Sequence, residues 1–123
     1  YMDAALDILS FETVIHIDSE TEVKSNDILM INADNSYTEI ELITGDKKRN
    51  IRKSLKAWEE ELRQYGFMRI NDACIINCKY VKGIEGDNAV IKDIDVKVRI
   101  SRRKKAECIK FFRAYRAKSS KYI

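Results

Sequence analysis

Residues 37–62 read YTEIELITGDKKRNIRKSLKAWEEEL, and two periodicities follow one another within this stretch. Between residues 37 and 43, polar and apolar side chains alternate, which is typical of a half-buried strand. Gly45-Asp46 is a turn signal, so residues 47–52 are expected to form the partner strand. The first half of the stretch therefore predicts an antiparallel hairpin.

The second half of the stretch changes to a helical period. Ser54 is expected to cap a helix of about three turns. Three apolar side chains spaced i, i+3 and i+7 share one face of this helix, namely Leu55, Trp58 and Leu62. Gly66 is the expected C-cap. One short helix thus follows the hairpin.

The rest of the chain consists mainly of short strand signals. Residues 28–31, ILMI, form a continuous apolar run, as expected for a strand buried on both faces. A hairpin is expected around Gly86-Asp87-Asn88 and a basic helix from Lys104 to about Lys118. Further strands are expected within residues 11–18, 21–23, 67–70, 74–77, 80–84, 89–91 and 95–100. This order predicts a mostly-β domain of antiparallel hairpins with one central helix and one C-terminal helix.

Length and charge add to this outline. The 123 residues fit one domain, and the formal net charge is only +3. Residues 101–123 contain nine Lys and Arg residues and one acid, Glu107, and so carry a charge of +8. The first hundred residues contain 14 Lys and Arg residues and 19 acids, and so carry a charge of −5. This asymmetry favours a face that binds a polyanion, or a basic tail. No apolar run approaches the roughly 18 residues of a membrane span.

Catalytic and metal-binding constellations are not evident in the sequence. His16 is the only histidine, and the three cysteines form no CxxC motif, so we predict neither an enzyme nor a metal site. Cys74, Cys78 and Cys108 are expected to be small buried hydrophobic residues in a reducing compartment, here the cytoplasm.

Charged residues in the regular elements have simpler expected roles. The acids of residues 59–61 are expected to form a solvated helix face, and Arg69 is expected to pair with Glu39 or Glu41. In the basic set of residues 47–53, strict alternation would place Lys48 and Arg52 on one strand face and the other bases on the opposite face. The set could contact a nucleic-acid backbone, although not all of it could meet one partner.

The cluster Arg102-Arg103-Lys104-Lys105 at the strand–helix junction is the main candidate for binding. Basic clusters neutralise phosphates, with an affinity that falls as salt rises. The alternative interpretation is a solvated helix start. Against that alternative, Lys104 and Lys105 near a helix N-terminus oppose the helix dipole, and a local cost of this kind hints at a function.

Five segments, in this order, resemble the LytTR DNA-binding domain, an output domain of many bacterial response regulators. NDILMINA resembles the family's opening DI-x-YIEA, and SYT stands where Asn-Tyr-Thr is usual. IRKSLKAWEEEL resembles R-x-SLK-x-EE-x-L, and the closing ISRR matches IS-R-R. The strands after the helix resemble F-x-RIHRS-x-IVN-x-x-YI-x-x-I. The segments occupy residues 26–33, 36–38, 51–62, 67–84 and 100–103.

The resemblance implies an elongated antiparallel multi-sheet fold whose loops enter successive major grooves of duplex DNA. Carried over by position, it implies base contacts from Arg103, Asn71, Asp72, Ser36 and Tyr37. The phosphate contacts that it suggests, together with the basic set above, are Arg102, Lys104, Lys105, Asn35 and Lys48. It covers about residues 12–114, leaving residues 1–11 as an extension or linker remnant and 115–123 as a basic tail.

The chain departs from the family pattern in two loops. Asn71-Asp72-Ala73 replaces His-Arg-Ser, and Ser36 replaces the usual Asn. Asp72 would repel phosphate, although a carboxylate can accept from cytosine N4. The hypothesis is therefore a sequence-specific bacterial transcription regulator, an output domain of a two-component system. The alternative is a protein-interaction module on the same fold with weakened or lost DNA binding.

Several partners follow from the resemblance alone. Family members often bind tandem repeat sites as pairs, which implies a homodimer on DNA, and an upstream receiver domain is common. The sequence does not define the target site, the upstream domain or the oligomeric state. No cofactor and no membrane partner are predicted.

Overall fold

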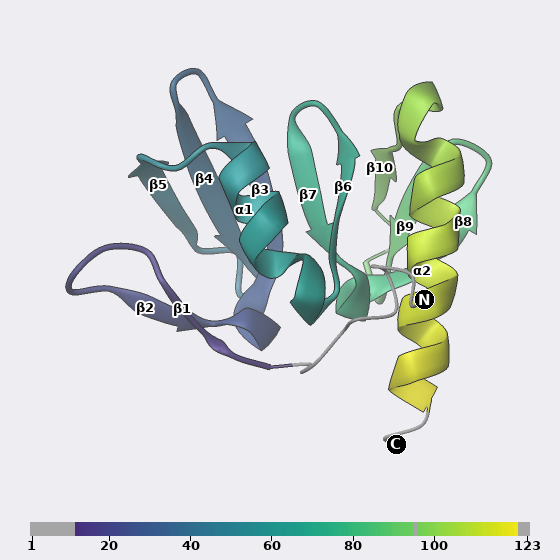
Figure 1. Ribbon diagram of the computed structural model, residues 1–123, viewed down its shortest axis with the longest axis horizontal. Coiled ribbons are helices and arrows are strands. Elements are labelled where there is room, and N and C mark those ends of the chain that lie inside the picture. The colour runs from purple at the N-terminus through teal and green to yellow at the C-terminus, as the bar shows by residue number, and fades with distance from the viewer. Residues whose placement is uncertain (1–11, 95, 121–123) are drawn as a thin grey trace.

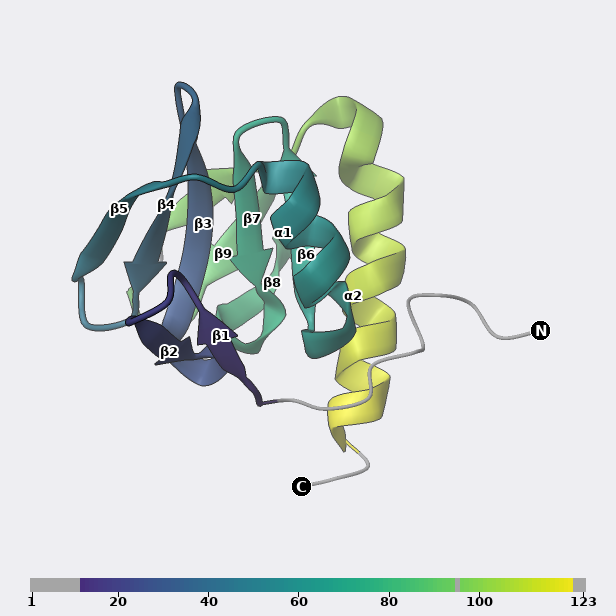
Figure 2. The same ribbon diagram turned by 60° about the vertical axis from the view of Figure 1, so that its left-hand side comes forward.

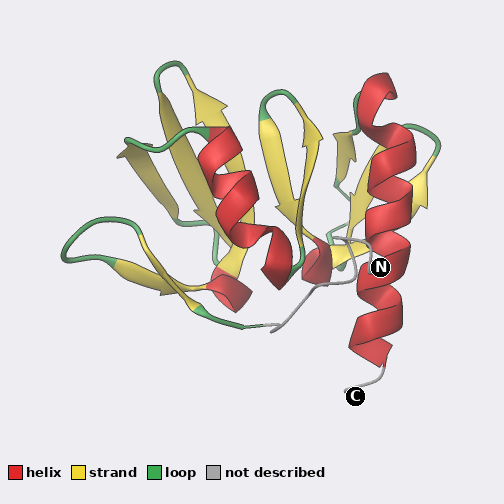
Figure 3. Cartoon of the chain, in the orientation of Figure 1, coloured by secondary structure: helices red, strands yellow, loops and turns green. Residues whose placement is uncertain are grey.

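The computed structural model describes residues 12–94 and 96–120, with side chains described as far as Lys118. Three antiparallel sheets and two helices make up this part of the chain (Figures 1 and 3). The predicted mostly-β fold with a central and a C-terminal helix is confirmed. In chain order the elements are β1 (Val14–His16), β2 (Glu22–Lys24), β3 (Ile28–Asp34), β4 (Tyr37–Leu42), β5 (Lys47–Ile51), α1 (Leu55–Leu62), β6 (Phe67–Asn71), β7 (Cys74–Asn77), β8 (Val81–Glu85), β9 (Asn88–Ile91), β10 (Lys97–Arg99) and α2 (Lys105–Ser120).

The central sheet has five strands in the order β5-β4-β3-β7-β6. Its middle strand, β3, is buried on both faces, as its apolar run predicts. A register shift between Ile28 and Met30 allows Ile28 and Ile31 to enter one core while Leu29 enters the other. The sheet therefore has two apolar faces, and each needs a cover.

Helix α1 covers the first face (Figure 1). The Ser54 hydroxyl accepts from the Ala57 N–H at 3.0 Å, which confirms the predicted N-cap. Trp58 is fully buried, and its Nε1 donates to the Thr38 Oγ1 at 3.0 Å, so its polar atom is satisfied inside the core. This core fixes the β3–β4 hairpin against α1.

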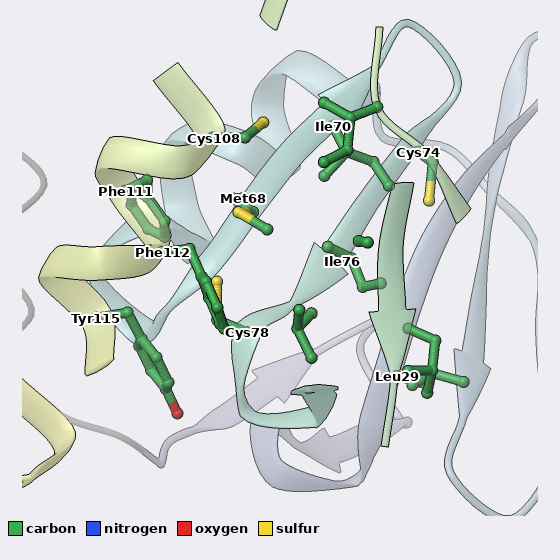
Figure 4. Packing of buried hydrophobic residues seen from close by; sticks show 14 residues of the cluster. Leu29, Met68, Ile70, Cys74, Ile76, Cys78, Cys108, Phe111, Phe112 and Tyr115 are labelled. Carbon is green, nitrogen blue, oxygen red and sulfur yellow. The ribbon is translucent and has the colours of Figure 1, made fainter. Parts of the chain in front are cut away.

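The three-stranded sheet β10-β9-β8 and helix α2 cover the second face (Figure 4). Helix α2 contributes four buried side chains to the core that contains Met68 and Cys78: Cys108, Phe111, Phe112 and Tyr115. All three cysteines are buried, as predicted. Ile109 is only half-buried and Arg116 is exposed, so the buried face of α2 is made by Cys108, Phe111, Phe112 and Tyr115.

Gly66 joins the two cores. It ends a 3-10 turn that follows α1, with φ +88°, as the predicted C-cap requires. An added Cβ would lie 2.5 Å from the Tyr115 Cε1, so α2 packs where a side chain would otherwise stand. The helix continues to Ser120 past the expected domain boundary at residue 114, while the expected extension of residues 1–11 lies outside the described residues.

Two expected charge arrangements are wrong. Arg69 pairs with Glu59 of α1 at 3.5 Å, and Glu39 pairs instead with Arg49 at 3.1 Å. Glu59 is therefore part of a contact between α1 and β6, not of a solvated face. The reason is that α1 crosses the sheet beside β6, a long-range placement that local periodicity does not reveal.

Strict alternation also fails in β5. Lys48 lies opposite Ile40 and Ile51 lies opposite Thr38, so two residues of β5, Arg49 and Asn50, stand opposite one residue of β4. Asn50 takes up the extra residue with φ +58°. The bulge brings the buried Ile51 onto the core face and ends the strand before Arg52.

Candidate nucleic-acid interface

Three polar segments lie at one end of the molecule, at the top in Figure 1 and again after the rotation in Figure 2. We call this end the loop edge. It comprises the β3–β4 turn at residues 35–37, the β6–β7 turn at residues 71–73, and residues 102–105, where a 3-10 turn enters α2. The fold thus places at one end of the molecule loops that are more than sixty residues apart in the sequence (Figure 1).

Arg103 meets the β6–β7 turn directly. Its Nη2 donates to the Asp72 Oδ1 at 2.8 Å, and the two side chains are 74% and 80% exposed. An exposed ion pair of this kind contributes little stability, typically up to about 1 kcal/mol. The guanidinium of Arg103 therefore remains accessible for a ligand, with further N–H groups available beside Asp72.

The β6–β7 turn is held by its own side chains and by Arg69. The Asn71 Oδ1 accepts from the Ala73 N–H at 2.7 Å, and its Nδ2 donates to the Arg99 carbonyl at 2.8 Å. Arg69 donates to the carbonyls of Asn71 and Asp72 at 3.2 and 3.0 Å. The Asn71 amide thus organises the loop edge by joining the turn to β10.

Lys105 is also paired at the loop edge. Its Nζ lies 2.9 Å from the Asp87 Oδ1, which comes from the β8–β9 turn. The hydrogen bond and charge of Lys105 hold the pKa of Asp87 below its usual value. Asp87 thereby offsets part of the unfavourable charge of Lys105 at the start of α2. Lys104 is half-buried, whereas Arg102 is exposed.

The β3–β4 turn forms the far end of the loop edge. Asn35 and Ser36 are exposed, and Asn35 takes a left-handed conformation with φ +55° that asparagine tolerates. The Arg52 guanidinium lies 6.0 Å from the Tyr37 ring centroid, at the outer limit of a cation–π contact. Arg52 therefore joins this turn, a placement that the sequence analysis missed because the bulge at Asn50 has no clear sequence signal.

Lys48 is the predicted site residue that the structure leaves apart. It lies opposite Ile40, three strand positions from Tyr37, or about 10 Å along β4. The remaining predicted residues all lie in the three segments of the loop edge. The two ends of the edge are nevertheless separate, so they would meet a ligand at different points.

The described residues also bear on metal binding and on thiol chemistry. Among them, no group of three or more His, Cys, Asp or Glu residues could hold a metal ion. Burial raises the pKa of Cys74 to about 12, which disfavours a thiolate, and His16 is exposed beside Glu22. Within the described part of the chain, no helix has the length and apolar character needed to cross a membrane.

Comparisons with known proteins agree with the fold. A LytTr DNA-binding domain from Bacillus cereus has a similar structure, with a TM-score of 0.61 over 81% of this chain and 94% of that chain, at 15% identity. The search of curated proteins found no match. The model of the LytTr DNA-binding domain family matches residues 18–113, which include all three segments of the loop edge. The chain therefore belongs to the LytTR DNA-binding domain family.

Proposed function

We propose that this chain binds duplex DNA sequence-specifically through the loop edge, as the output domain of a bacterial two-component transcription regulator. The observation that carries the proposal is that residues 102–105 and two polar turns lie at one end of a domain with two apolar cores (Figure 1). Phosphate contacts would position the domain, while base contacts in the major groove would select the sequence. A regulator of this kind works where the chromosome lies, so the proposal includes the cytoplasm.

Arg103 is the proposed principal base reader. Its guanidinium is exposed and held by Asp72 on one side, and it can pair bidentately with guanine O6 and N7. Asp72 would accept from a neighbouring cytosine N4, and Ser36 and Tyr37 would read a second groove. Because the Asn71 amide already bonds within the loop edge, its contribution to base reading would require one of these bonds to open.

The proposed phosphate contacts surround these readers. Arg102 and Lys104 flank Arg103, and Lys105 would have to share its charge with Asp87. Asn35 occupies the other end, where Arg52 is added to the set on the strength of its contact with Tyr37. Lys48 lies away from the edge, so any phosphate contact it makes would need DNA that extends along β5.

A second candidate function rests on the acids of the loop edge. Asp72 and Asp87 each pair with one of the four basic residues at positions 102–105, which leaves a net charge of +2 for these six side chains. A weaker polycation is also compatible with a protein-interaction module that no longer binds DNA. The two functions make opposite predictions for binding to duplexes.

Selection from a random duplex pool distinguishes them. The chain is incubated with the pool at low salt, and retained duplexes are amplified and sequenced over several rounds. A DNA-binding domain enriches a motif, and a dimer on tandem sites enriches two copies about one helical turn apart. Enrichment of no motif, together with no retention at low salt, would instead favour the interaction module.

A further inference from the structure

A groove of about 430 Å³ lies between α2 and the β8–β9 hairpin. The helix starts at the loop edge and runs away from it (Figure 1), so Arg116 is about 16 Å further along the axis than Lys105. Its far cations therefore stand apart from the proposed DNA surface. The groove is lined by Gly83, Ile84, Gly86, Lys105, Ile109, Phe112, Arg113 and Arg116.

The buried and half-buried residues that line the groove are apolar, and the exposed ones at its border include two arginines. Ile84 and Ile109 are half-buried, and Phe112 is 6% exposed. Arg113 and Arg116 are both exposed, and the Arg116 guanidinium lies 5.6 Å from the Phe112 ring centroid. This cation–π contact places a charged, planar donor group directly at the border of the apolar surface.

Gly83 of β8 also lines the groove. It lies within β8, it needs no left-handed backbone, and an added Cβ would meet nothing within 4 Å. It stands where the pairing of β8 with β9 shifts register, a position at which glycine is common, so the strand pairing itself accounts for this glycine. Gly66 differs, because its positive φ and Tyr115 both demand glycine. The effect of Gly83 is to leave space in the groove.

We propose that this groove binds a small organic acid with an apolar chain or ring. The carboxylate would meet Arg113 and Arg116, since guanidinium groups bind carboxylates through paired hydrogen bonds. Lys105 starts α2, about 12 Å nearer the loop edge than Arg113 along the helix axis, and is not part of this assignment. The apolar body would cover Ile84, Ile109 and Phe112.

The size of the groove favours a small ligand. Ligand sites in proteins typically measure about 300–1,000 Å³, which includes this value. A stable protein partner would usually contact about 20–30 residues on each side, whereas eight residues line this groove. The assignment does not depend on DNA binding, because it uses neither the β3–β4 turn nor Arg103.

Nuclear magnetic resonance titration of the complete 123-residue chain with decanoate, below its micelle concentration, tests the proposal. Decanol and acetate serve as probes that lack the charge and the apolar body, respectively. Decanoate is expected to shift amide signals of α2 and β8 and to bind at least about tenfold more tightly than either control probe. Equal binding of decanoate and decanol would overturn the assigned role of the arginines.

Two variants locate the site. Gly83→Leu should fill the groove and weaken decanoate at least about tenfold, and the double variant Arg113→Gln with Arg116→Gln should do the same through loss of charge-assisted hydrogen bonds. Arg49→Gln, at an exposed arginine on β5, is the matched control and should bind decanoate like the parent. If Gly83→Leu fails to fold, the decanoate affinity of the double arginine variant tests the proposal by itself. Parental affinity in that pair, or binding only of an acidic peptide, would refute the proposal.

Discussion

The Asp72 carboxylate accepts a hydrogen bond from the Arg103 guanidinium at 2.8 Å, and both side chains are largely exposed. The two residues come from different loops, and Arg69 donates a hydrogen bond to the carbonyl of Asp72 at 3.0 Å. Asp72 therefore has two consequences for a DNA-binding edge. It orients the guanidinium of Arg103, and it places a negative charge where phosphates would approach.

Asp72→Asn separates these two consequences. The amide oxygen can still accept from Arg103, but the charge that repels phosphate is gone. We expect binding to unrelated duplexes to tighten by up to about fivefold, as the loss of one exposed charge pair implies, while discrimination at the base pair read by Arg103 declines. Titrations of a selected and a scrambled duplex measure both effects. Unchanged affinities for both duplexes would show that Asp72 does not face DNA.

Arg103→Ala tests the base reader. Loss of a bidentate guanine contact should cost about 1–3 kcal/mol on the selected duplex and should relax the preference at that position. Arg102→Ala is the neighbouring comparison: it should weaken all duplexes alike and reduce the slope of log affinity against log salt by about one unit. Parental affinity of Arg103→Ala for the selected duplex would remove Arg103 from the base-contacting set.

Gly66→Ala tests the junction between the two cores. A Cβ at this position would clash with the Tyr115 ring at 2.5 Å and would strain a residue with φ +88°. We expect a loss of unfolding free energy of about 1–3 kcal/mol, measured by urea denaturation. Gly83→Ala is the control, because Gly83 does not have a positive φ and its surroundings are open, so the variant should be neutral or slightly stabilising. Equal stability of the two variants would contradict the packing of α2 against Gly66.

Local signals predicted most of the fold. The alternation in residues 37–42, the Ser54 cap and the turn glycines each depend on neighbours in sequence, and the structure contains all three features. The errors concern contacts between distant elements. Arg69 pairs with Glu59 because α1 crosses beside β6, and Asn71 bonds to Arg99 because β10 returns there. Neither residue carries information about such a partner in its own sequence surroundings.

The loop edge shows the same division. The basic cluster at residues 102–105 stands out in the sequence, and the family resemblance predicts the loops that join it. The acids that pair with this cluster, Asp72 and Asp87, come from two separate hairpins. Which basic residue each of these acids pairs with depends on how the three sheets pack. The side-chain pairs at the loop edge could therefore not be predicted from the sequence.

Because their thiols are buried, Cys74 and Cys108 should make the free energy of unfolding fall as the pH becomes alkaline. Burial raises the pKa of Cys74 to about 12 and that of Cys108 to about 11, whereas cysteine thiols in the unfolded chain have a pKa of about 8.5. Above that pH the unfolded chain binds fewer protons than the native one, so the free energy of unfolding should fall as the pH rises towards the native values. Below about pH 8.5 this contribution is fully present.

Urea midpoints measured between pH 8 and pH 10.5 follow the decline. The variant with Cys74→Ala and Cys108→Ala should be less stable at pH 8, because two buried side chains become smaller, but its stability should fall less steeply with pH than that of the parent. Lysine deprotonation affects both proteins alike, so the difference between their slopes isolates the thiols. Parallel slopes would show that the thiols titrate similarly in the folded and unfolded chains, contrary to their burial in the second core.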